Sequence, residues 1–316
     1  MFIRIIYPIN IVRRKLNSCC LPQPQIPAKV KQASTAAPTL AKVTMFQGKR
    51  LYHFSDSVKR GKNDMHSFDE SKTRSLCKEN RRRAWARYNQ THLTRVYPSG
   101  RRLDSSNFNP ISAWSAGSQL VALNFQTNDF GRRLNDGRFR QNGQCGYVLK
   151  PNSLLNLSEK SVQQKIKSMS IKIISGSCLP KPKGSKKGES IDPYVNVTLF
   201  DVPNDGDNGK EIAQKMNTIS VPNNGFNPIW TQQNYFKFRV QTSDVAMVQL
   251  TVWHRDMSAR DGFIASASFP VNCMREGYRS VQLFDANNKR NGAFECAALL
   301  IEVKISYHGH QQVKMW

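Results

Sequence analysis

Residues 93–98 (LTRVYP), 104–107 (DSSN), 120–127 (LVALNFQT) and 146–151 (GYVLKP) decide the fold of the first half of the chain. The stretch from Leu120 to Phe125 is nearly all apolar, which is typical of a parallel strand buried on both faces. Residues 93–97 and 147–150 are also predicted as strands, and Pro98 and Gly100 end the first of them. The DSSN stretch has the composition of a loop.

The segment before residue 93 predicts a short strand followed by a long helix. Residues 51–54 (LYHF) are a short apolar candidate strand, and residues 67–70 (SFDE) fit a capping box. In that motif the Ser67 hydroxyl caps the helix while the Glu70 side chain reaches back. The helix is expected from Asp69 towards Gln90. Strands that alternate with helices indicate an α/β fold, here with four strands, which is half of an eight-stranded barrel.

The pattern changes beyond a polar linker at residues 156–167. Seven short segments there are strand-like, and several alternate apolar and polar residues. Turn-rich stretches separate them, which predicts an antiparallel sandwich. The segments are residues 170–174, 194–199, 235–240, 248–253, 263–269, 280–283 and 299–305.

The four opening stretches, in this order and spacing, resemble the second (Y-box) half of the catalytic barrel of eukaryotic phosphoinositide-specific phospholipase C. Residues 191–195 (IDPYV), 223–230 (NNGFNPIW) and 261–264 (DGFI) resemble a C2 domain. The resemblance implies an α/β fold, the second half of a TIM-type barrel, followed by an all-β C2 sandwich. The expected divisions are an N-terminal extension, the half barrel, the C2 domain and a tail, at residues 1–45, 46–158, 165–308 and 309–316.

Charge and cysteine content restrict the class of protein. The 316 residues include 47 Lys and Arg against 22 Asp and Glu, a net charge of +25. Such a charge implies an acidic partner, either an anionic membrane surface or a nucleic acid. No stretch approaches the roughly 18 apolar residues of a membrane span. The seven cysteines are odd in number and widely spaced, which predicts reduced thiols and no structural zinc.

Residues 1–45 differ in composition from the rest of the chain. They contain no Asp or Glu, open on an apolar stretch and continue with Pro, Ala, Ser and Thr. An acidic-poor, Arg-containing start is also found in mitochondrial transit peptides. The composition favours a disordered extension or the product of a misplaced start.

The resemblance assigns substrate contacts to Ser67, Arg95 and Tyr97. Ser67 and Arg95 would contact ring phosphates of phosphatidylinositol 4,5-bisphosphate, and Tyr97 would pack against the inositol ring. The chemistry agrees, because a planar guanidinium pairs bidentately with phosphate, and Arg95 and Tyr97 lie two apart on one strand and so point the same way. Taken alone, the residues also fit a helix cap, a structural ion pair and core packing.

The family's catalytic histidines and its active-site calcium ligands lie in the first (X) half of the barrel, which has no counterpart in this sequence. None of the six histidines falls in a catalytic motif of the family. The chain is therefore expected to be inactive alone. The missing X half would be one of its partners. The half barrel is not expected to fold independently, because it leaves sheet edges exposed, whereas the sandwich is expected to fold alone.

Calcium is the cofactor that the resemblance implies. Asp192, Asn223 and Asp256 match calcium-binding loop positions of a C2 domain, although His254 and Gly262 stand where carboxylates are common. Calcium takes six to eight oxygen ligands, so two absent carboxylates weaken the predicted site. The alternative is membrane contact by basic charge, through the loop lysines Lys181, Lys183, Lys186 and Lys187.

The function predicted by resemblance is that of a phosphoinositide phospholipase C. It would hydrolyse phosphatidylinositol 4,5-bisphosphate to diacylglycerol and inositol 1,4,5-trisphosphate, in the cytoplasm and peripherally at the plasma membrane. One alternative is a non-catalytic adaptor that binds anionic membranes and phosphoinositides. Nucleic-acid binding through the basic segment 81–87 is the less favoured alternative, since only charge supports it.

Overall fold

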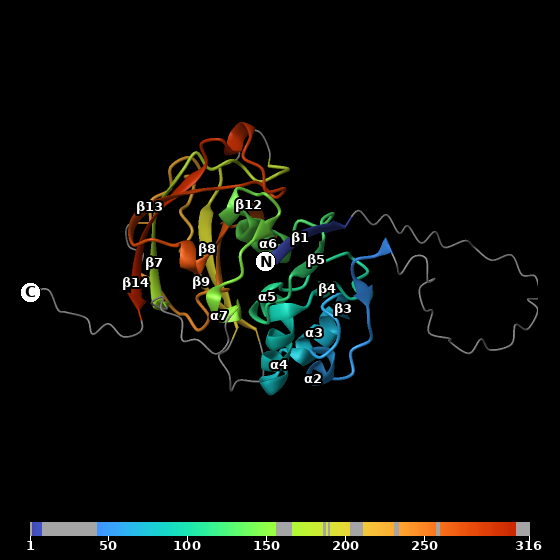
Figure 1. Cartoon of the computed structure of the whole chain (residues 1–316). Helices are drawn as coiled ribbons and strands as arrows, with labels where there is room; N and C mark the ends of the chain where they lie inside the picture. The colour runs from blue at the N-terminus through green and yellow to red at the C-terminus, as the bar shows by residue number, and fades with distance from the viewer. Residues whose placement is uncertain are drawn as a thin grey trace, which may run out of the picture.

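The computed structural model describes residues 2–7, 43–155, 166–185, 188, 190–202, 211–230, 234–256 and 260–307. They form a mixed α/β part and an all-β part, which lie side by side in Figure 1 with helix α6 between them. The predicted fold class, half of a TIM-type barrel followed by a sandwich, is confirmed. None of the helices in these ranges has the length and apolar character needed to cross a bilayer.

The α/β part is built on one six-stranded sheet with the order β2-β3-β4-β5-β1-β6. Strands β2 to β5 are parallel neighbours; β4 and β5 were predicted from the sequence, whereas β2 and β3 were not. The strands are β1 (Phe2–Tyr7), β2 (Gln47–Gly48), β3 (Asp64–Asp69), β4 (Thr94–Tyr97), β5 (Leu120–Asn124) and β6 (Tyr147–Val148). The helices are α2 (Phe54–Ser57), α3 (Glu70–Leu76), α4 (Glu79–Thr91), α5 (Ile111–Ser115), α6 (Phe130–Phe139), η1 (Arg140–Asn142) and α7 (Asn152–Leu155).

The N-terminal segment departs from the prediction. Residues Phe2–Tyr7 form β1, which pairs in parallel with β5 and antiparallel with β6. The prediction of a disordered extension over residues 1–45 was therefore wrong for residues 2–7, because their backbone groups pair with those of neighbouring strands. Because β1 lies between β5 and β6, the predicted strand at 147–150 is shorter and antiparallel. Residues 8–42 lie outside the described residues.

The predicted capping box is also wrong. Ser67 lies within β3, and the N-cap of α3 is Asp69, whose side chain accepts a hydrogen bond from the Lys72 amide at 2.7 Å. Parallel pairing of β3 with β4 holds the backbone extended as far as Asp69, so the helix cannot begin earlier. The single helix expected from Asp69 to Gln90 is divided into α3 and α4, because Lys78 adopts an extended conformation. The strand predicted at residues 51–54 is absent, since Phe54 begins α2.

The sandwich consists of two four-stranded sheets, in the orders β10-β7-β14-β13 and β12-β11-β8-β9. All seven predicted strands are present, and β9 is an eighth that was not predicted. The apolar side chains between the sheets form one core, which includes Trp230, Val197, Leu250 and Ile301. The strands are β7 (Ile166–Ser177), β8 (Pro193–Asp201), β9 (Ile212–Asn217), β10 (Phe236–Arg239), β11 (Met247–His254), β12 (Gly262–Pro270), β13 (Gly277–Gln282) and β14 (Ala298–Tyr307), with short helices η2 (Val271–Cys273) and η3 (Gly292–Phe294).

The two parts share a hydrophobic core. Val202, Val245 and Met247 belong to the sandwich, yet they pack in the same buried cluster as Trp114 and Leu134 of the α/β part. At 25 cal/mol per Å² of apolar area, each such side chain contributes about 1.5–3 kcal/mol when it is fully buried. Much of the stability of either part therefore depends on the other.

Helix α6 makes several of the polar contacts across this interface. Arg133 places its guanidinium 5.1 Å from the ring centroid of Phe263, and Arg138 donates to the Asp244 carbonyl at 3.2 Å. Burial lowers the pKa of Arg138 to about 10, so its side chain is still a cation at neutral pH. Gly137 lies directly against the backbone of Ser268. Figure 1 shows α6 against β12 and close to β8.

The five described cysteines are free thiols, in agreement with the predicted reduced state. Cys77 is buried, whereas Cys145, Cys273 and Cys296 are exposed. Cys19 and Cys20 lie outside the described residues.

A buried aromatic cluster behind β3 contains His66. His66 is 1% exposed, its Nδ1 lies 2.7 Å from the Lys49 carbonyl, and its ring centroid is 4.9 Å from that of Tyr88. The Nδ1–H therefore donates, and the buried Nε2 has no partner among the described residues. Burial lowers the pKa of His66 below its ordinary value of 6.5, because it penalises the charged imidazolium.

We expect the free energy of unfolding to fall as the pH decreases below about 6.5, because the unfolded chain then binds a proton at this residue more readily than the folded protein does. Urea unfolding at pH 7.5 and pH 5.5 measures this loss. The His66→Asn variant, whose amide can still donate to the Lys49 carbonyl, should be less stable at both pH values. Its free energy of unfolding should fall less between pH 7.5 and pH 5.5 than that of the unmodified protein. An unchanged pH dependence in the variant would assign the effect to other groups.

Candidate functional site

The strand register brings the three predicted substrate-binding residues together. In the parallel pair β3–β4, Ser67 lies opposite Arg95 and Asp69 lies opposite Tyr97. Side chains alternate along a strand, so Ser67, Arg95 and Tyr97 all lie on one face of the sheet. The alternating neighbours Phe68 and Val96 are buried on the other face. Ser67 is exposed, and Arg95 and Tyr97 are half-buried.

Arg95 and Tyr97 form a stacked pair. The Arg95 guanidinium lies 4.9 Å from the ring centroid of Tyr97, within the range of a cation–π interaction. Burial lowers the pKa of Arg95, but a guanidinium remains protonated in proteins at neutral pH. The pair therefore presents a fixed positive charge beside an aromatic face, a combination suited to a phosphorylated ring with an apolar side.

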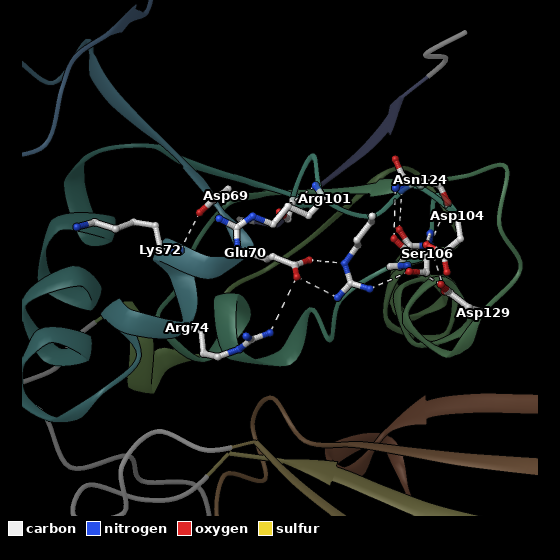
Figure 2. Close-up of polar contacts among 12 residues, drawn as sticks. Asp69, Glu70, Lys72, Arg74, Arg101, Asp104, Ser106, Asn124 and Asp129 are labelled. Carbon is white, nitrogen blue, oxygen red and sulfur yellow. Dashed lines mark hydrogen bonds and ion pairs between the residues drawn. The ribbon is translucent and has the colours of Figure 1, made fainter. Parts of the chain in front are cut away.

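An ion pair holds the loop that follows β4. Arg102 donates from Nε to Glu70 Oε2 at 2.6 Å and from Nη2 to Glu70 Oε1 at 3.0 Å, which is a bidentate pair, and from Nη1 to Ser106 at 2.9 Å. Figure 2 shows Glu70 also facing Arg74, which lies 4.0 Å away. Since Glu70 begins α3 directly after β3, this pair fixes the loop beyond Tyr97 relative to the end of the strand that carries Ser67.

A second network closes the neighbouring end of β5. The Asn107 side chain accepts from the Asn124 amide at 2.6 Å and donates to the Asn124 carbonyl at 3.0 Å, as a neighbouring strand would. Asp129 caps α6 through the Arg132 amide and accepts from the Asn107 amide at 2.6 Å. These residues therefore support the structure around the site (Figure 2).

A polar cavity of about 190 Å³ lies beneath the Glu70–Arg102 pair and reaches the sandwich. Its wall includes Glu211, which precedes β9 and accepts a hydrogen bond from the Ser112 hydroxyl at 2.7 Å. Burial raises the pKa of Glu211 above its ordinary value. The contact joins the support of the candidate site to the C2 part. Sequence reasoning missed Arg102 and Glu211 and assigned Glu70 to a capping box, because nothing local to these residues indicates their partners.

The described histidines lie elsewhere. His66 is on the opposite face of β3, His92 stacks on Tyr88 with ring centroids 4.5 Å apart, and His254 belongs to the sandwich. The exposed His53 precedes α2. His308 and His310 lie outside the described residues.

The predicted calcium-binding positions are held by hydrogen bonds. Asp192 Oδ1 accepts from the Asn223 amide at 2.8 Å, and the Asp192 amide donates to His254 Nδ1 at 2.9 Å. The Asp256 amide donates to Asp261 Oδ1 at 3.1 Å, and the Tyr194 hydroxyl donates to Asp261 Oδ2 at 2.7 Å. That last bond lowers the pKa of Asp261, so its carboxylate is charged and both its oxygens are in use.

This donor set does not fit calcium as it stands. Among the residues that the structure describes, no three His, Cys, Asp or Glu side chains come together in a way that could hold a metal ion. The Arg255 guanidinium, 4.7 Å from the ring centroid of Tyr194, adds positive charge beside these loops. A calcium site at Asp192, Asn223 and Asp256 stays a prediction without support from this geometry.

Comparisons with known proteins agree with the architecture. Residues 40–153 match the family model "Phosphatidylinositol-specific phospholipase C, Y domain", and residues 167–286 match the C2 domain. The crystal structure of S. officinalis PLC21 superposes with a TM-score of 0.72 at 29% identity, covering 89% of this chain and 35% of that one.

Sequence relatives are named as phosphodiesterases. The chain is 40% identical over 241 residues to 1-phosphatidylinositol 4,5-bisphosphate phosphodiesterase delta-4 of Homo sapiens, covering 74% of this chain and 29% of the relative. The human delta-1 protein is 35% identical and covers 77% of this chain and 31% of its own length. The chain thus spans about a third of the length of these relatives. With a Y domain followed by a C2 domain, it belongs to the phosphoinositide-specific phospholipase C family.

Proposed function

We propose that this chain supplies the headgroup-binding half of the active site of a phosphatidylinositol 4,5-bisphosphate phosphodiesterase. The register that places Ser67 opposite Arg95, with Tyr97 stacked on that arginine, is the observation that carries the proposal. The names of the relatives, which are phosphatidylinositol 4,5-bisphosphate phosphodiesterases, support this choice of substrate. The products would be diacylglycerol and inositol 1,4,5-trisphosphate.

Each residue has a distinct role in this proposal. The Arg95 guanidinium pairs with a ring phosphate, and the Ser67 hydroxyl donates a hydrogen bond to the same or a neighbouring phosphate. The Tyr97 ring packs against the C–H face of the inositol and, together with Arg95, limits the ring to one orientation. The Glu70–Arg102 pair keeps the following loop in place, so the binding face is formed before the lipid arrives.

The proton-transferring histidines and the active-site calcium belong to the first half of the barrel in this proposal. The 316 residues by themselves then bind the headgroup but do not cleave it. An assay with radiolabelled phosphatidylinositol 4,5-bisphosphate in mixed micelles tests this, with and without the separately expressed X half of the human delta-4 relative. Hydrolysis only in the mixture supports the proposal, whereas hydrolysis by the chain alone contradicts it.

Arg95→Ala is expected to weaken binding of the headgroup by about 10- to 100-fold, since a hydrogen-bonded charge pair contributes about 1.5–3 kcal/mol. Fluorescence titration with soluble inositol 1,4,5-trisphosphate measures the affinity without a membrane. Arg87→Ala is the matched control, because Arg87 is exposed on α4 and its removal changes the net charge equally. Equal losses in both variants would reduce the role of Arg95 to general electrostatic attraction.

A second candidate function is that of an adaptor whose C2 domain binds anionic membranes by charge, without calcium. Lys181 and Lys183 are exposed in the loop after β7. Among the described residues, no cluster of His, Cys, Asp or Glu side chains could hold a metal ion there. Such binding would place the protein peripherally on the cytoplasmic face of the plasma membrane. Each lysine near an anionic surface contributes about 1 kcal/mol before screening by salt.

Replacing both Lys181 and Lys183 with glutamate is therefore expected to reduce binding to phosphatidylserine vesicles by at least about tenfold. Co-sedimentation in calcium and in EGTA measures the effect. Lys215→Glu combined with Lys237→Glu makes the same charge change on β9 and β10 and serves as the control. A requirement for calcium would instead favour a metal site in the loops. Retention of RNA at physiological salt would favour the nucleic-acid alternative.

A further inference from the structure

A cavity of about 480 Å³ lies between the end of α6 and the edge of the sandwich, away from Ser67 and Arg95. One wall is Gly137, Arg140 and Gln141, and the other comes from β12, the turn after η2 and β13. Protein sites for small ligands have volumes of roughly 300–1,000 Å³ and are mostly apolar with a few polar groups. The cavity has a volume within that range, and its lining has the same mixed character.

The floor of the cavity is apolar and incompletely covered. Phe269, Met274 and Val281 pack against the sandwich core, yet each stays partly exposed where it lines the cavity. Phe284 is also half-buried there. Large apolar side chains that line one cavity expose apolar surface to water, which is unfavourable. A hydrocarbon group bound in the cavity would remove that surface from water.

The rim of the cavity is positively charged. Arg140 lies over Phe284 with its guanidinium 3.5 Å from the ring centroid and donates to Asn288 at 3.0 Å. Arg279 donates to the backbone carbonyls of Arg275, Glu276 and Tyr278, which accept the bonds without neutralising the charge.

Arg275 and Arg279 lie in the lining of the same cavity. Within the ranges that the structure describes, neither Arg275 nor Arg279 forms an ion pair. Glu276, in the same turn, accepts a hydrogen bond from the Ile305 amide at 2.7 Å. A ligand with an anionic group would find three guanidinium groups next to an apolar hollow.

We propose that this cavity binds a single-chain anionic amphiphile, with its hydrocarbon chain on Phe269, Met274 and Val281 and its anionic head at Arg140, Arg275 and Arg279. The head is a carboxylate, as in a fatty acid, or a phosphate, as in a lysophospholipid. Arginine pairs with either group through two parallel hydrogen bonds. A purely apolar ligand would form no ion pairs with the arginines of the rim. An inositol phosphate would leave the apolar floor exposed to water.

The site would join the two parts of the protein. Arg140 follows α6, whereas Arg275 and Arg279 belong to the sandwich, so one anionic head would contact both. Occupancy is therefore expected to strengthen the interface that α6 forms, and to do so without contact with the residues proposed to bind the inositol headgroup.

Isothermal titration of the full chain with twelve-carbon amphiphiles below their micelle concentrations tests the proposal. Dodecanoate or twelve-carbon lysophosphatidic acid is expected to bind one molecule per chain, at least tenfold more tightly than the zwitterionic twelve-carbon lysophosphatidylcholine. Binding of both anions indicates a general anionic site, and binding of the phosphate alone identifies a lysophospholipid. Equal affinity for the zwitterionic lipid, or several weak sites, would overturn the proposal.

Two variants locate the binding. Arg275→Gln removes an exposed charge in a turn and should reduce the affinity for the anionic amphiphile at least fivefold. Lys237→Gln, on the opposite edge of the same sheet, should leave that affinity unchanged. Val281→Trp fills the hollow and should abolish binding. If Val281→Trp fails to fold, Arg275→Gln alone decides, and an unchanged affinity in that variant would contradict the assigned site.

Discussion

Replacing Gly137 with alanine is expected to destabilise the protein by about 3 kcal/mol, the upper end of the usual range for overpacking a filled interior. A Cβ at this position would lie 2.6 Å from the carbonyl carbon and 2.7 Å from the Cβ of Ser268. The first of these belongs to the β12 backbone, which cannot move aside as a flexible side chain can. The helix and the sheet would have to move apart at this point.

Helix propensity makes the opposite prediction, which sharpens the test. Within a helix, alanine is favoured over glycine by about 1 kcal/mol, so an unpacked position would gain stability. Urea unfolding of Gly137→Ala gives the sign directly. Gly61→Ala is the control, because nothing lies within 4 Å of an added Cβ there. A stabilised Gly137→Ala variant would mean that α6 is not pressed against the sandwich.

Asp201→Ala is expected to cost about 3–5 kcal/mol, since buried donors left without acceptors each cost about 1–3 kcal/mol. Asp201 is fully buried at the end of β8, and its carboxylate accepts from the amides of Val202, Gln241 and Thr242 and from the Thr242 hydroxyl. Burial raises the pKa of Asp201, while those hydrogen bonds oppose the rise. The same turn positions Val202, part of the shared core.

Asp201→Asn separates the hydrogen bonds from the charge. The amide keeps one acceptor oxygen, so this variant should recover part of the stability that Asp201→Ala loses in urea unfolding. Asp285→Ala, at an exposed turn where the carboxylate accepts from the Lys289 amide, should cost far less. Equal losses for Asp201→Ala and Asp285→Ala would show that the buried network contributes little.

Strands with a strong local pattern were predictable from the sequence. Residues 194–199 and 248–253 alternate apolar and polar residues, and both appear as central strands of the sandwich. Strand β9 was missed because the apolar and polar residues of Ile212–Asn217 do not alternate regularly. It lies at a sheet edge, where pairing with β8 rather than composition determines its conformation.

The candidate site was predictable from local pattern only for Arg95 and Tyr97, which share a predicted strand. Ser67 lies beside them because it belongs to β3, which pairs with β4 and was not predicted from the sequence. The Glu70–Arg102 pair joins positions 32 residues apart, and such a contact depends on loop conformation. For the same reason Glu70 was assigned to a local capping box, although a long-range arginine holds its carboxylate.

The shared core means that the boundary seen in sequence is not a boundary in folding. Family resemblance divides the chain between residues 153 and 167, but Val202, Val245 and Met247 would face water if the sandwich were expressed without its neighbour. A single cleavage between the two parts should therefore yield two fragments that stay associated and elute together in gel filtration. The domain names would then describe family relationships rather than independently folding units.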